Sequence, residues 1–406
     1  MADYEVDVVV VGSGPGGSTF ARIASQHGLE VMVFDKRKEI GNPVRCGEGL
    51  GAREVVRQGL ELPKEVFSTE IYGAKVVGPK GQEIVWRGED TRGWVLERKF
   101  FDKWLAELAV SKGAKVKVHH RVVDVIHENG KPAGVIVVNQ DGKEMEVRAK
   151  VVVSAEGMEA HIARKLGFDA VHRLYDVDTC YEYEMEPYDH ENLIELYFGN
   201  DIAPRGYVWI FPKANRKANV GIGIGAHLIN GLKRGNIQGA APKPLLDKFI
   251  VNHDGLKEAS IFNDFGGIIS VGAPANEFVK DNALVLGTAA KQVDPIHGGG
   301  IALAMEAGWM AAHAVAEAIE KNDTSKEMLY KLYEKPWRDT TGKKLERRLL
   351  LRKVLEKLND DDLNFIFDQL TAGDLDLVMK GKYAEVVGRM VKGRPQLLKV
   401  LSALLG

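Results

Sequence analysis

Three glycines near the start of the chain have the spacing of a phosphate-binding turn. They directly follow the β-branched apolar run 5–11 in the order GxGxxG, at Gly12, Gly14 and Gly17. Small residues come next and open a helical pattern, which predicts a strand, a tight turn and a helix. Such a turn presents backbone N–H groups and the positive end of a helix dipole to a pyrophosphate. Asp35 ends a second apolar run, where an acid that binds a ribose is expected, so these residues predict a dinucleotide site.

A polar loop over residues 36–50 carries the first candidate for acid–base chemistry. Three polar residues fall within four positions, namely Arg45, Cys46 and Glu48. A thiol with an ordinary pKa of about 8.5 is protonated at neutral pH and can give up a proton. A single cysteine is more often a small packed residue. The neighbouring glycines would let the backbone approach a ligand closely, so both interpretations of Cys46 stay open.

A row of aromatic residues marks a second candidate site, in the segment PRGYVWIFP at 204–212. Tyr207, Trp209 and Phe211 alternate along a predicted strand, so their side chains should lie on one face. Such a row most commonly belongs to the core of a sheet. The alternative is an apolar wall beside a substrate or a flat cofactor ring.

Hydrophobic periodicity indicates the elements that must position these residues. It predicts a helix over 98–112, a strand over 115–120, a three-stranded meander over 121–149 and a buried parallel strand over 150–157. From 175 to about 275 the strands become two-faced, which predicts an antiparallel sheet with one face open to a ligand. Three consecutive glycines, 298–300, then begin a long Ala-rich helix and form a second anion-binding turn. Residues 327–406 are predicted to be largely helical.

The composition is that of an ordinary globular protein of 406 residues with a formal net charge of −2. This balanced charge argues against nucleic acid as a partner. Two cysteines are too few for a disulfide framework and favour a reducing cytoplasm. The first strand begins at residue 5, so no signal peptide is expected, and no apolar run approaches the ~20 residues of a membrane span.

Any membrane contact should therefore be peripheral, at the inner face of the cell membrane. One stretch near the end of the chain is rich in basic residues, namely Lys343, Lys344, Arg347, Arg348, Arg352 and Lys353. A solvated helix face and a face that meets anionic lipid are both open interpretations of this stretch.

Four motifs together resemble the geranylgeranyl reductase family, within the wider p-hydroxybenzoate-hydroxylase-like flavoproteins. They are GSGPGG with Asp35, PVRCGEG, PRGYVWIFP and KQVDPIHGGGI, and the likeness runs from residue 5 to about 320. The third motif is the most specific, because it fits the family pattern PxxYxWxFP at every fixed position. Within the family the chain most resembles the archaeal digeranylgeranylglycerophospholipid reductases.

The resemblance implies FAD as the cofactor and assigns residues to its parts. The ADP half would be held by Gly12, Gly14, Gly16, Gly17 and Asp35, and the flavin would be lined by Arg45, Cys46, Gly47 and Gly49. Further cofactor contacts would come from Arg98, Val122, Thr288, Gly299, Gly300 and Ile301. The chain has Gly287-Thr288 where the family usually has a GD pair, whose acid meets the ribityl chain. It also has Glu156-Gly157 for the fold's usual DG, and Asp35 where Glu is common.

The activity implied is the saturation of isolated C=C bonds in the geranylgeranyl chains of archaeal-type ether-lipid precursors. Reduced FAD would deliver hydride to one alkene carbon, and an acid would protonate the other. Cys46 is the first candidate for that acid, followed by Tyr207 and His297, and the row of Tyr207, Trp209 and Phe211 would line the substrate. No second complete GxGxxG unit is present, so a reduced ferredoxin or a similar carrier is the expected electron donor.

Two other functions are compatible with this kind of fold. One is a flavin monooxygenase or halogenase, which does not need the PxxYxWxFP motif. The other is a quinone-linked electron-transfer flavoprotein. Those relatives hold an iron–sulfur cluster on four cysteines, and this chain has two.

The same patterns predict an α/β fold with three parts. The expected division is a discontinuous, Rossmann-like FAD-binding domain (1–70, 95–172 and 276–326), an antiparallel-sheet substrate domain (71–94 and 173–275) and a helical C-terminal domain (327–406).

Overall fold

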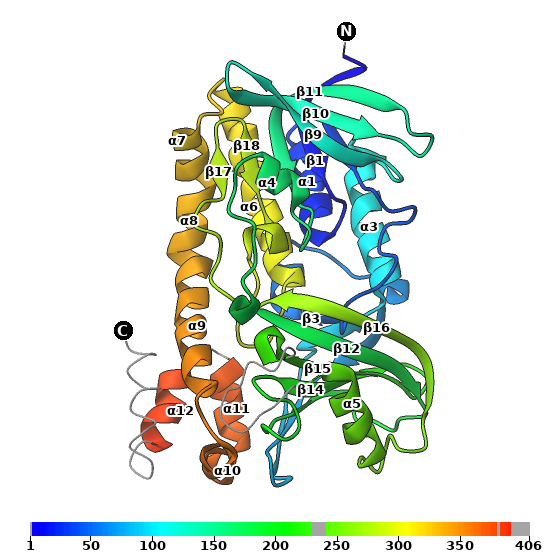
Figure 1. Ribbon diagram of the computed structural model, residues 1–406, viewed down its shortest axis with the longest axis vertical. Coiled ribbons are helices and arrows are strands. Elements are labelled where there is room, and N and C mark those ends of the chain that lie inside the picture. Colours follow the sequence, from blue (N-terminus) through cyan, green and yellow to red (C-terminus); the bar gives the residue numbers. More distant parts are fainter. Residues whose placement is uncertain (1, 229–240, 380–381, 391–406) are drawn as a thin grey trace.

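The computed structural model describes residues 2–228, 241–379 and 382–390. Two large sheets lie toward opposite ends of the molecule, and a run of helices, α7 to α9, extends along one side (Figure 1). The first sheet contains the N-terminal strand, and the second contains the aromatic strands. This arrangement confirms the expected α/β fold with an antiparallel sheet and a helical C-terminal region.

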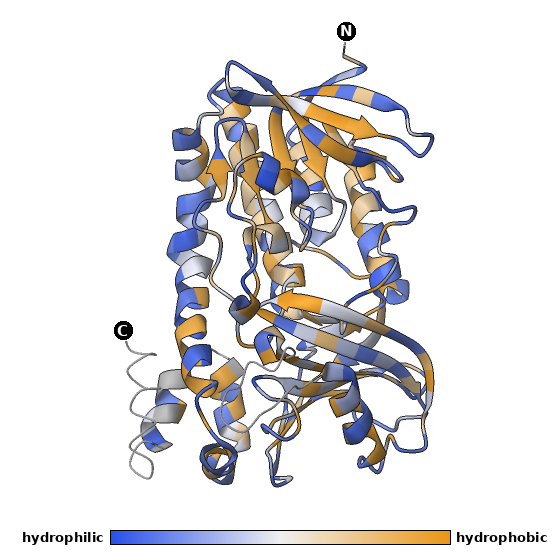
Figure 2. Cartoon of the chain, in the orientation of Figure 1, coloured by the Kyte–Doolittle hydropathy of each residue, from blue (hydrophilic) through white to orange (hydrophobic). Residues whose placement is uncertain are grey.

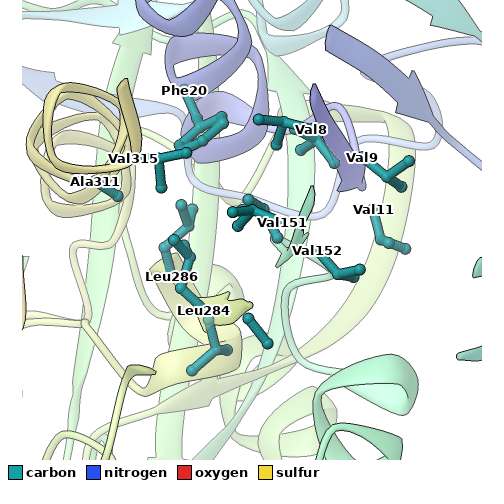
Figure 3. Packing of buried hydrophobic residues seen from close by; sticks show 14 of the residues in the cluster. Val8, Val9, Val11, Phe20, Val151, Val152, Leu284, Leu286, Ala311 and Val315 are labelled. Atoms are coloured by element: carbon teal, nitrogen blue, oxygen red, sulfur yellow. The ribbon is translucent and has the colours of Figure 1, made fainter. Parts of the chain in front are cut away.

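The first sheet is mostly parallel and has the strand order β17-β18-β11-β1-β2-β8. The strands in this order are β1 (Tyr4–Val11), β2 (Val31–Phe34), β8 (Lys115–Lys117), β11 (Glu144–Ser154), β17 (Val279–Lys280) and β18 (Ala283–Val285), and β10 (Lys131–Val138) and β9 (Arg121–Glu128) extend the sheet from β11. The helices α1 (Pro15–Gln26), α3 (Arg98–Ser111) and α6 (Ile301–Glu320) contribute residues to the same apolar core as this sheet. Val8 of β1, Phe20 of α1 and Val315 of α6 belong to one apolar core (Figure 3). Because the central strands are buried on both faces, they are continuous β-branched runs rather than alternating ones.

Strand β11 differs from its prediction. The last strand of the expected meander and the expected parallel strand over 150–157 form one continuous element. Its first part pairs antiparallel with β10, which pairs with β9, and its second part runs parallel to β1. No glycine, proline or asparagine stands between 143 and 156 to break the strand, so one strand serves both pairings.

Glycines bring α1 close to its neighbours. Gly12 has φ +100°, and a Cβ at that residue would stand 2.6 Å from the Ala155 carbonyl oxygen. A Cβ on Gly17 would lie 2.0 Å from the Gly12 carbonyl oxygen, and one on Gly308 of α6 would lie 2.4 Å from that of Gly16. The tight turn and the close helix packing that the spacing predicts are therefore present.

The second sheet has the strand order β16-β12-β15-β14-β13-β5-β6, and all of its pairs except β13 with β5 are antiparallel. Its strands are β5 (Gly73–Val77), β6 (Glu83–Arg87), β12 (Val177–Glu186), β13 (Leu193–Tyr197), β14 (Tyr207–Lys213), β15 (Lys217–Gly225) and β16 (Ser260–Ser270). Val208 and Ile210 of β14 enter an apolar cluster with Leu246 of α5 (Pro242–Val251), which covers one face. The opposite face carries the aromatic row.

A small three-stranded sheet follows the cysteine loop. Its order is β3-β7-β4, formed by β3 (Gly49–Gly51), β7 (Gly93–Leu96) and β4 (Phe67–Ile71). The short helix α2 (Ala52–Arg57) continues from β3, and α4 (His161–Lys165) follows β11. The carboxylate of Glu156 accepts hydrogen bonds from the backbone N–H groups of Ile162 and Ala163. Glu156, which stands where the fold usually has aspartate, therefore caps α4.

The C-terminal region is largely helical in its described part, as expected, and residues 380–381 and 391–406 of that prediction lie outside the described residues. Helices α7 (Lys326–Leu329), α8 (Lys335–Trp337) and α9 (Lys343–Leu355) are joined by π-helical segments into one run, and α10 (Asp360–Gln369), α11 (Ala372–Met379) and α12 (Tyr383–Met390) follow. Hydrophobic residues concentrate in the strands of the first sheet, whereas α7 and α8 are largely hydrophilic (Figure 2). Within the described ranges, no helix combines the length and hydropathy needed to cross a bilayer. The domain boundaries stay a prediction.

Candidate active site

The first glycine-rich turn leaves space where a pyrophosphate is expected. Gly14 is the N-cap of α1, its backbone is extended, and a Cβ built on it would meet no atom within 4 Å. The first N–H groups of α1 open toward that space without side-chain caps. The turn therefore fits a dinucleotide phosphate by shape and by charge.

Asp35 is held at the end of β2 by the same turn. Its Oδ2 accepts hydrogen bonds from the Ser13 backbone N–H at 3.1 Å and from the Ser13 hydroxyl at 2.7 Å. Its Oδ1 accepts a third hydrogen bond from the Arg37 N–H at 2.9 Å. The carboxylate is thus fixed beside the glycine turn, and its contact with a ribose stays a prediction.

The second glycine-rich turn begins α6. Gly300 is the N-cap, and a Cβ on it would lie 3.8 Å from the Thr288 hydroxyl oxygen. Gly299 and Ile301 flank it, so four of the predicted cofactor residues gather at one helix N-terminus. The remaining predicted cofactor residues, namely Arg45, Cys46, Gly47, Gly49, Arg98 and Val122, do not join either turn. Val122 is buried in β9 opposite Val137, and Arg45 is exposed on the cysteine loop.

The cysteine loop is anchored by a residue to which the sequence assigned no role. Glu48 has φ +72° and is buried. Its Oε1 accepts the Arg98 backbone N–H at 2.7 Å, and its Oε2 accepts Lys213 Nζ and Asn219 Nδ2, each at 2.8 Å. Lys213 continues the alternation of the aromatic row by one step, and this pattern could have indicated it. The Glu48 N–H in turn donates to Cys46 Sγ at 3.2 Å, which orients the thiol.

Two members of the aromatic row, Trp209 and Phe211, lie against this loop. The rings of Tyr207 and Trp209 are 6.0 Å apart, and those of Trp209 and Phe211 are 6.3 Å apart. A Cβ on Gly47 would stand 3.0 Å from Trp209 Nε1, and one on Gly49 would stand 3.1 Å from Phe211 Cε2. The residues between the rings, Val208 and Ile210, enter the apolar cluster under α5, and the three aromatic residues do not.

Glycines in β15 allow the rings to lie flat across the sheet. A Cβ on Gly221 would stand 2.2 Å from Trp209 Cζ2. Without side chains at such positions, the indole of Trp209 reaches across β15 to β12. Its Nε1 donates a hydrogen bond to Glu182 Oε2 at 2.8 Å.

Glu182 is the main residue that sequence reasoning missed. It is only 2% exposed, and burial, followed by the charge of Glu48, raises its pKa to about 8. The alternation in the segment TCYEYEM places it on the same face as Cys180, which was the available signal.

The three candidate acids lie in two parts of the site. Cys46 is on the cysteine loop, whereas Tyr207 and His297 are in contact with each other. Burial raises the pKa of the Cys46 thiol, against the opposing charge of Arg98, which itself forms an ion pair with Asp102. The Tyr207 hydroxyl donates to the His297 carbonyl oxygen at 2.6 Å, and burial raises its pKa far above the ordinary value. Cys46 and Tyr207 are therefore both protonated at neutral pH.

Two residues of the basic stretch, Arg348 and Arg352, point inward. The prediction of a solvated or lipid-facing surface is therefore wrong for these two. Arg352 Nη2 lies 2.8 Å from the buried carboxylate of Asp178, and Arg348 forms an ion pair with buried Asp294. A buried carboxylate without a cation is costly, so α9 turns these two guanidinium groups inward. Arg352 also borders a cavity of about 20 Å³, next to Tyr207. The other four basic residues are exposed.

The fold and the two glycine-rich turns define a FAD-dependent oxidoreductase. The family model described as FAD binding domain matches residues 5–194, and the one described as geranylgeranyl reductase catalytic domain matches residues 176–269. The chain belongs to the geranylgeranyl reductase family, and FAD is its cofactor.

Relatives of known name support this over almost the whole chain. A digeranylgeranylglycerophospholipid reductase from Methanosarcina acetivorans is 38% identical over 90% of this chain and 88% of its own length. One from Methanocaldococcus jannaschii is 37% identical over 98% of each chain. The crystal structure of a geranylgeranyl bacteriochlorophyll reductase-like protein from Thermoplasma acidophilum has a TM-score of 0.88 and 36% identity, and it covers 97% of this chain and 99% of that one. A flavin-dependent brominase, with a TM-score of 0.68 and 20% identity over 96% of this chain and 94% of that one, shares the fold alone.

Proposed function

We propose that the protein saturates C=C bonds in the geranylgeranyl chains of archaeal-type ether-lipid precursors. The observation that carries this proposal is the meeting of the aromatic row with the cysteine loop, on the face of the second sheet opposite α5. An isoprenoid chain offers no hydrogen-bonding groups, so an aromatic surface suits it. The names of the relatives at 35–38% identity point to the same substrate class.

In this proposal the cofactor and the substrate are bound by different parts of the chain. Bound FAD supplies the hydride chemistry. The N-terminus of α1 at Gly14 would hold the diphosphate of FAD, and Gly299 and Gly300 at the start of α6 would contact the cofactor. Tyr207, Trp209 and Phe211 orient the isoprenoid chain and exclude water from it.

Cys46 is the proposed acid. Its Sγ accepts a hydrogen bond from the Glu48 N–H, and the next residue along the loop, Gly47, meets Trp209 of the aromatic row. Its raised pKa keeps the proton on sulfur at neutral pH, which is the form that can protonate the second alkene carbon.

The test begins with protein reduced by dithionite without oxygen. On addition of a geranylgeranyl lipid we expect the flavin to reoxidise, and mass spectrometry to show one saturated bond for each flavin. A lipid that already has saturated chains is the matched control and should leave the flavin reduced. Flavin that stays reduced with the unsaturated lipid would contradict the proposal. Lipids that copurify with the protein, identified by mass spectrometry, would indicate the physiological substrate.

We also propose that a reduced carrier such as a ferredoxin supplies the electrons, and that the protein meets the membrane peripherally. The exposed basic residues of α9 are Lys343, Lys344, Arg347 and Lys353. Charges of this kind attract anionic lipid and are screened by salt. On vesicles that contain anionic lipid, we expect binding at low salt and release at about 1 M salt, measured by cosedimentation. Neutral vesicles are the control, and retention at high salt would exclude a purely electrostatic contact.

A further inference from the structure

A buried ion pair joins the second sheet to the cysteine loop and has no part in the function described above. Lys213, at the end of β14, and Glu48, on the loop, are both buried. Lys213 Nζ lies 2.8 Å from Glu48 Oε2 and 3.1 Å from Glu97 Oε1. The pair therefore connects the strand that carries the aromatic row to the loop that carries Cys46.

Glu48 has a backbone conformation that is unfavourable for a residue with a side chain. Its φ of +72° lies in the left-handed region, and such a conformation persists only where the surroundings fix it. The Arg98 N–H donates to Oε1 at 2.7 Å, and the Leu96 N–H donates to the Glu48 carbonyl oxygen at 2.8 Å. Asn219 and Lys213 both donate to Oε2. Among these four donors, only Lys213 offers a charged group to the carboxylate.

This conformation directs the Glu48 N–H to the sulfur of Cys46, at 3.2 Å from Sγ. A hydrogen bond donated to sulfur favours the thiolate over the thiol. The thiolate is the form of Cys46 that remains once its proton has gone to the alkene. The N–H therefore stabilises the charge that develops on sulfur during the step, as a fixed donor does in other active sites.

We propose that Lys213 is a positioning residue that holds the Glu48 N–H on the sulfur of Cys46. The importance of this contact for catalysis rests on the proposed role of Cys46 as the acid. Removal of the ammonium group would leave the Glu48 carboxylate as a buried charge without its cation, which is costly. The carboxylate would then turn toward water, φ of Glu48 would relax to a negative value, and the N–H would leave Sγ. Lys213 thus acts on the thiol through Glu48.

The ionisable groups that face the thiol and the ion pair come from four elements. They are Glu48 on the cysteine loop, Glu97 and Arg98 at the start of α3, Cys180 and Glu182 on β12, and Lys213 on β14. The charge of Arg98 is balanced by Asp102. Burial raises the pKa of Glu182 to about 8, and its ionisation above that pH disfavours the thiolate. This effect is common to all the variants compared below.

The pH profile of Cys46 alkylation tests the proposal on the FAD-bound protein without substrate or turnover. Iodoacetamide is the reagent, and mass spectrometry of the modified peptide separates Cys46 from Cys180. In Lys213→Met we expect the midpoint to move upward by about one pH unit, because the thiolate loses a hydrogen bond. Lys217→Met is the matched control and should keep the wild-type midpoint. It removes the lysine directly opposite, on β15, which pairs with Glu184 at 3.3 Å. An unchanged midpoint in Lys213→Met would overturn the proposal.

A purely structural role of Lys213 predicts the opposite sign. A loosened loop would expose the thiol to water, remove the effect of burial and move the midpoint to lower pH. Lys213→Arg keeps the positive charge and should restore most of the wild-type midpoint. A lower midpoint in Lys213→Met, or equal shifts in the two variants, would contradict the positioning role.

A double variant shows whether Lys213 acts through Glu48. Glu48→Met removes the carboxylate, so adding Lys213→Met should leave the midpoint where Glu48→Met alone puts it. Apolar residues of similar volume commonly replace a buried ion pair without loss of stability, so the double variant is suited to folding. A further shift in the double variant would refute the proposed connection, because Lys213 would then affect the thiol without Glu48.

Single turnover links this contact to the reaction. In Lys213→Met we expect the reoxidation of reduced flavin by a geranylgeranyl lipid to slow by about tenfold, with FAD content and reduction by dithionite unchanged. Wild-type rates in Cys46 variants would refute the role of Cys46 as the acid, while the alkylation profiles still test the contact. Slow turnover in Cys46 variants, together with a wild-type rate and midpoint in Lys213→Met, would refute the role of Lys213 alone.

Discussion

Replacing Cys46 with alanine is expected to slow the reoxidation of reduced flavin by a geranylgeranyl lipid by about 10²- to 10⁴-fold, the usual contribution of a general acid. The thiol lies on the loop whose glycines meet Trp209 and Phe211, and burial raises its pKa, which keeps the proton on sulfur at neutral pH. The variant should still bind FAD and still be reduced by dithionite, because neither step uses the thiol proton. The measurement is a single turnover without oxygen, followed by flavin absorbance and by mass spectrometry of the lipid.

Cys46→Ser is the sharper variant because the hydroxyl is nearly isosteric with the thiol and is a far weaker acid. It should be slowed to a similar degree, although it preserves the packing of the loop. If Cys46 is only a small packed residue, both variants should instead lose a little stability and keep the wild-type rate. In that event Tyr207 becomes the first candidate for the acid, followed by His297.

The pH dependence of the same step has a defined sign. A raised thiol pKa means that the acid form persists above neutral pH, so the single-turnover rate should be constant from neutral pH upward. It should fall only where the thiol ionises. A rate that rises with pH in this range would be incompatible with a thiol acid.

Gly14→Val is expected to yield protein that folds but is colourless. A side chain at this position meets no protein atom within 4 Å, so the valine would occupy the space of the pyrophosphate instead. We expect FAD affinity to fall by more than about tenfold, which corresponds to about 1.4 kcal/mol. Flavin absorbance per protein, and the FAD released on denaturation, measure the loss.

Gly51→Val is the matched control for this variant. Gly51 is also the N-cap of a helix, with an extended backbone and open space at its Cβ position. Both variants replace a glycine at a helix N-cap by valine, so we expect the same change in unfolding temperature. Only the change at Gly14 should lower the flavin content. Gly12 is unsuitable for this purpose, because a Cβ there would clash with the Ala155 carbonyl oxygen and damage the fold. Full FAD occupancy in Gly14→Val would refute the assignment of this turn.

Most of the fold was predictable because its signals are local. The turn after β1, the helix that begins at Arg98 and the antiparallel alternation of β12 to β15 each depend on residues close together in the chain. The same dependence on local signals explains why β11, which is one continuous strand, was predicted as two. Pairing with two different neighbours divides that strand, and no residue within it marks the change.

The sequence by itself determined the two glycine-rich turns, the cysteine loop and the aromatic row, since spacing and alternation specify which side chains share a face. Only the tertiary structure decided which charged groups complete the site. Glu182 meets Trp209 across 27 positions, Lys213 meets Glu48 across 165, and Arg352 meets Asp178 across 174. Alternation can place Glu182 or Lys213 on one face of its strand, but it does not identify the distant partner, because that pairing depends on how the strands, sheets and helices come together. Burial, which raises the pKa values of Cys46 and Glu182, likewise arises only when those elements come together.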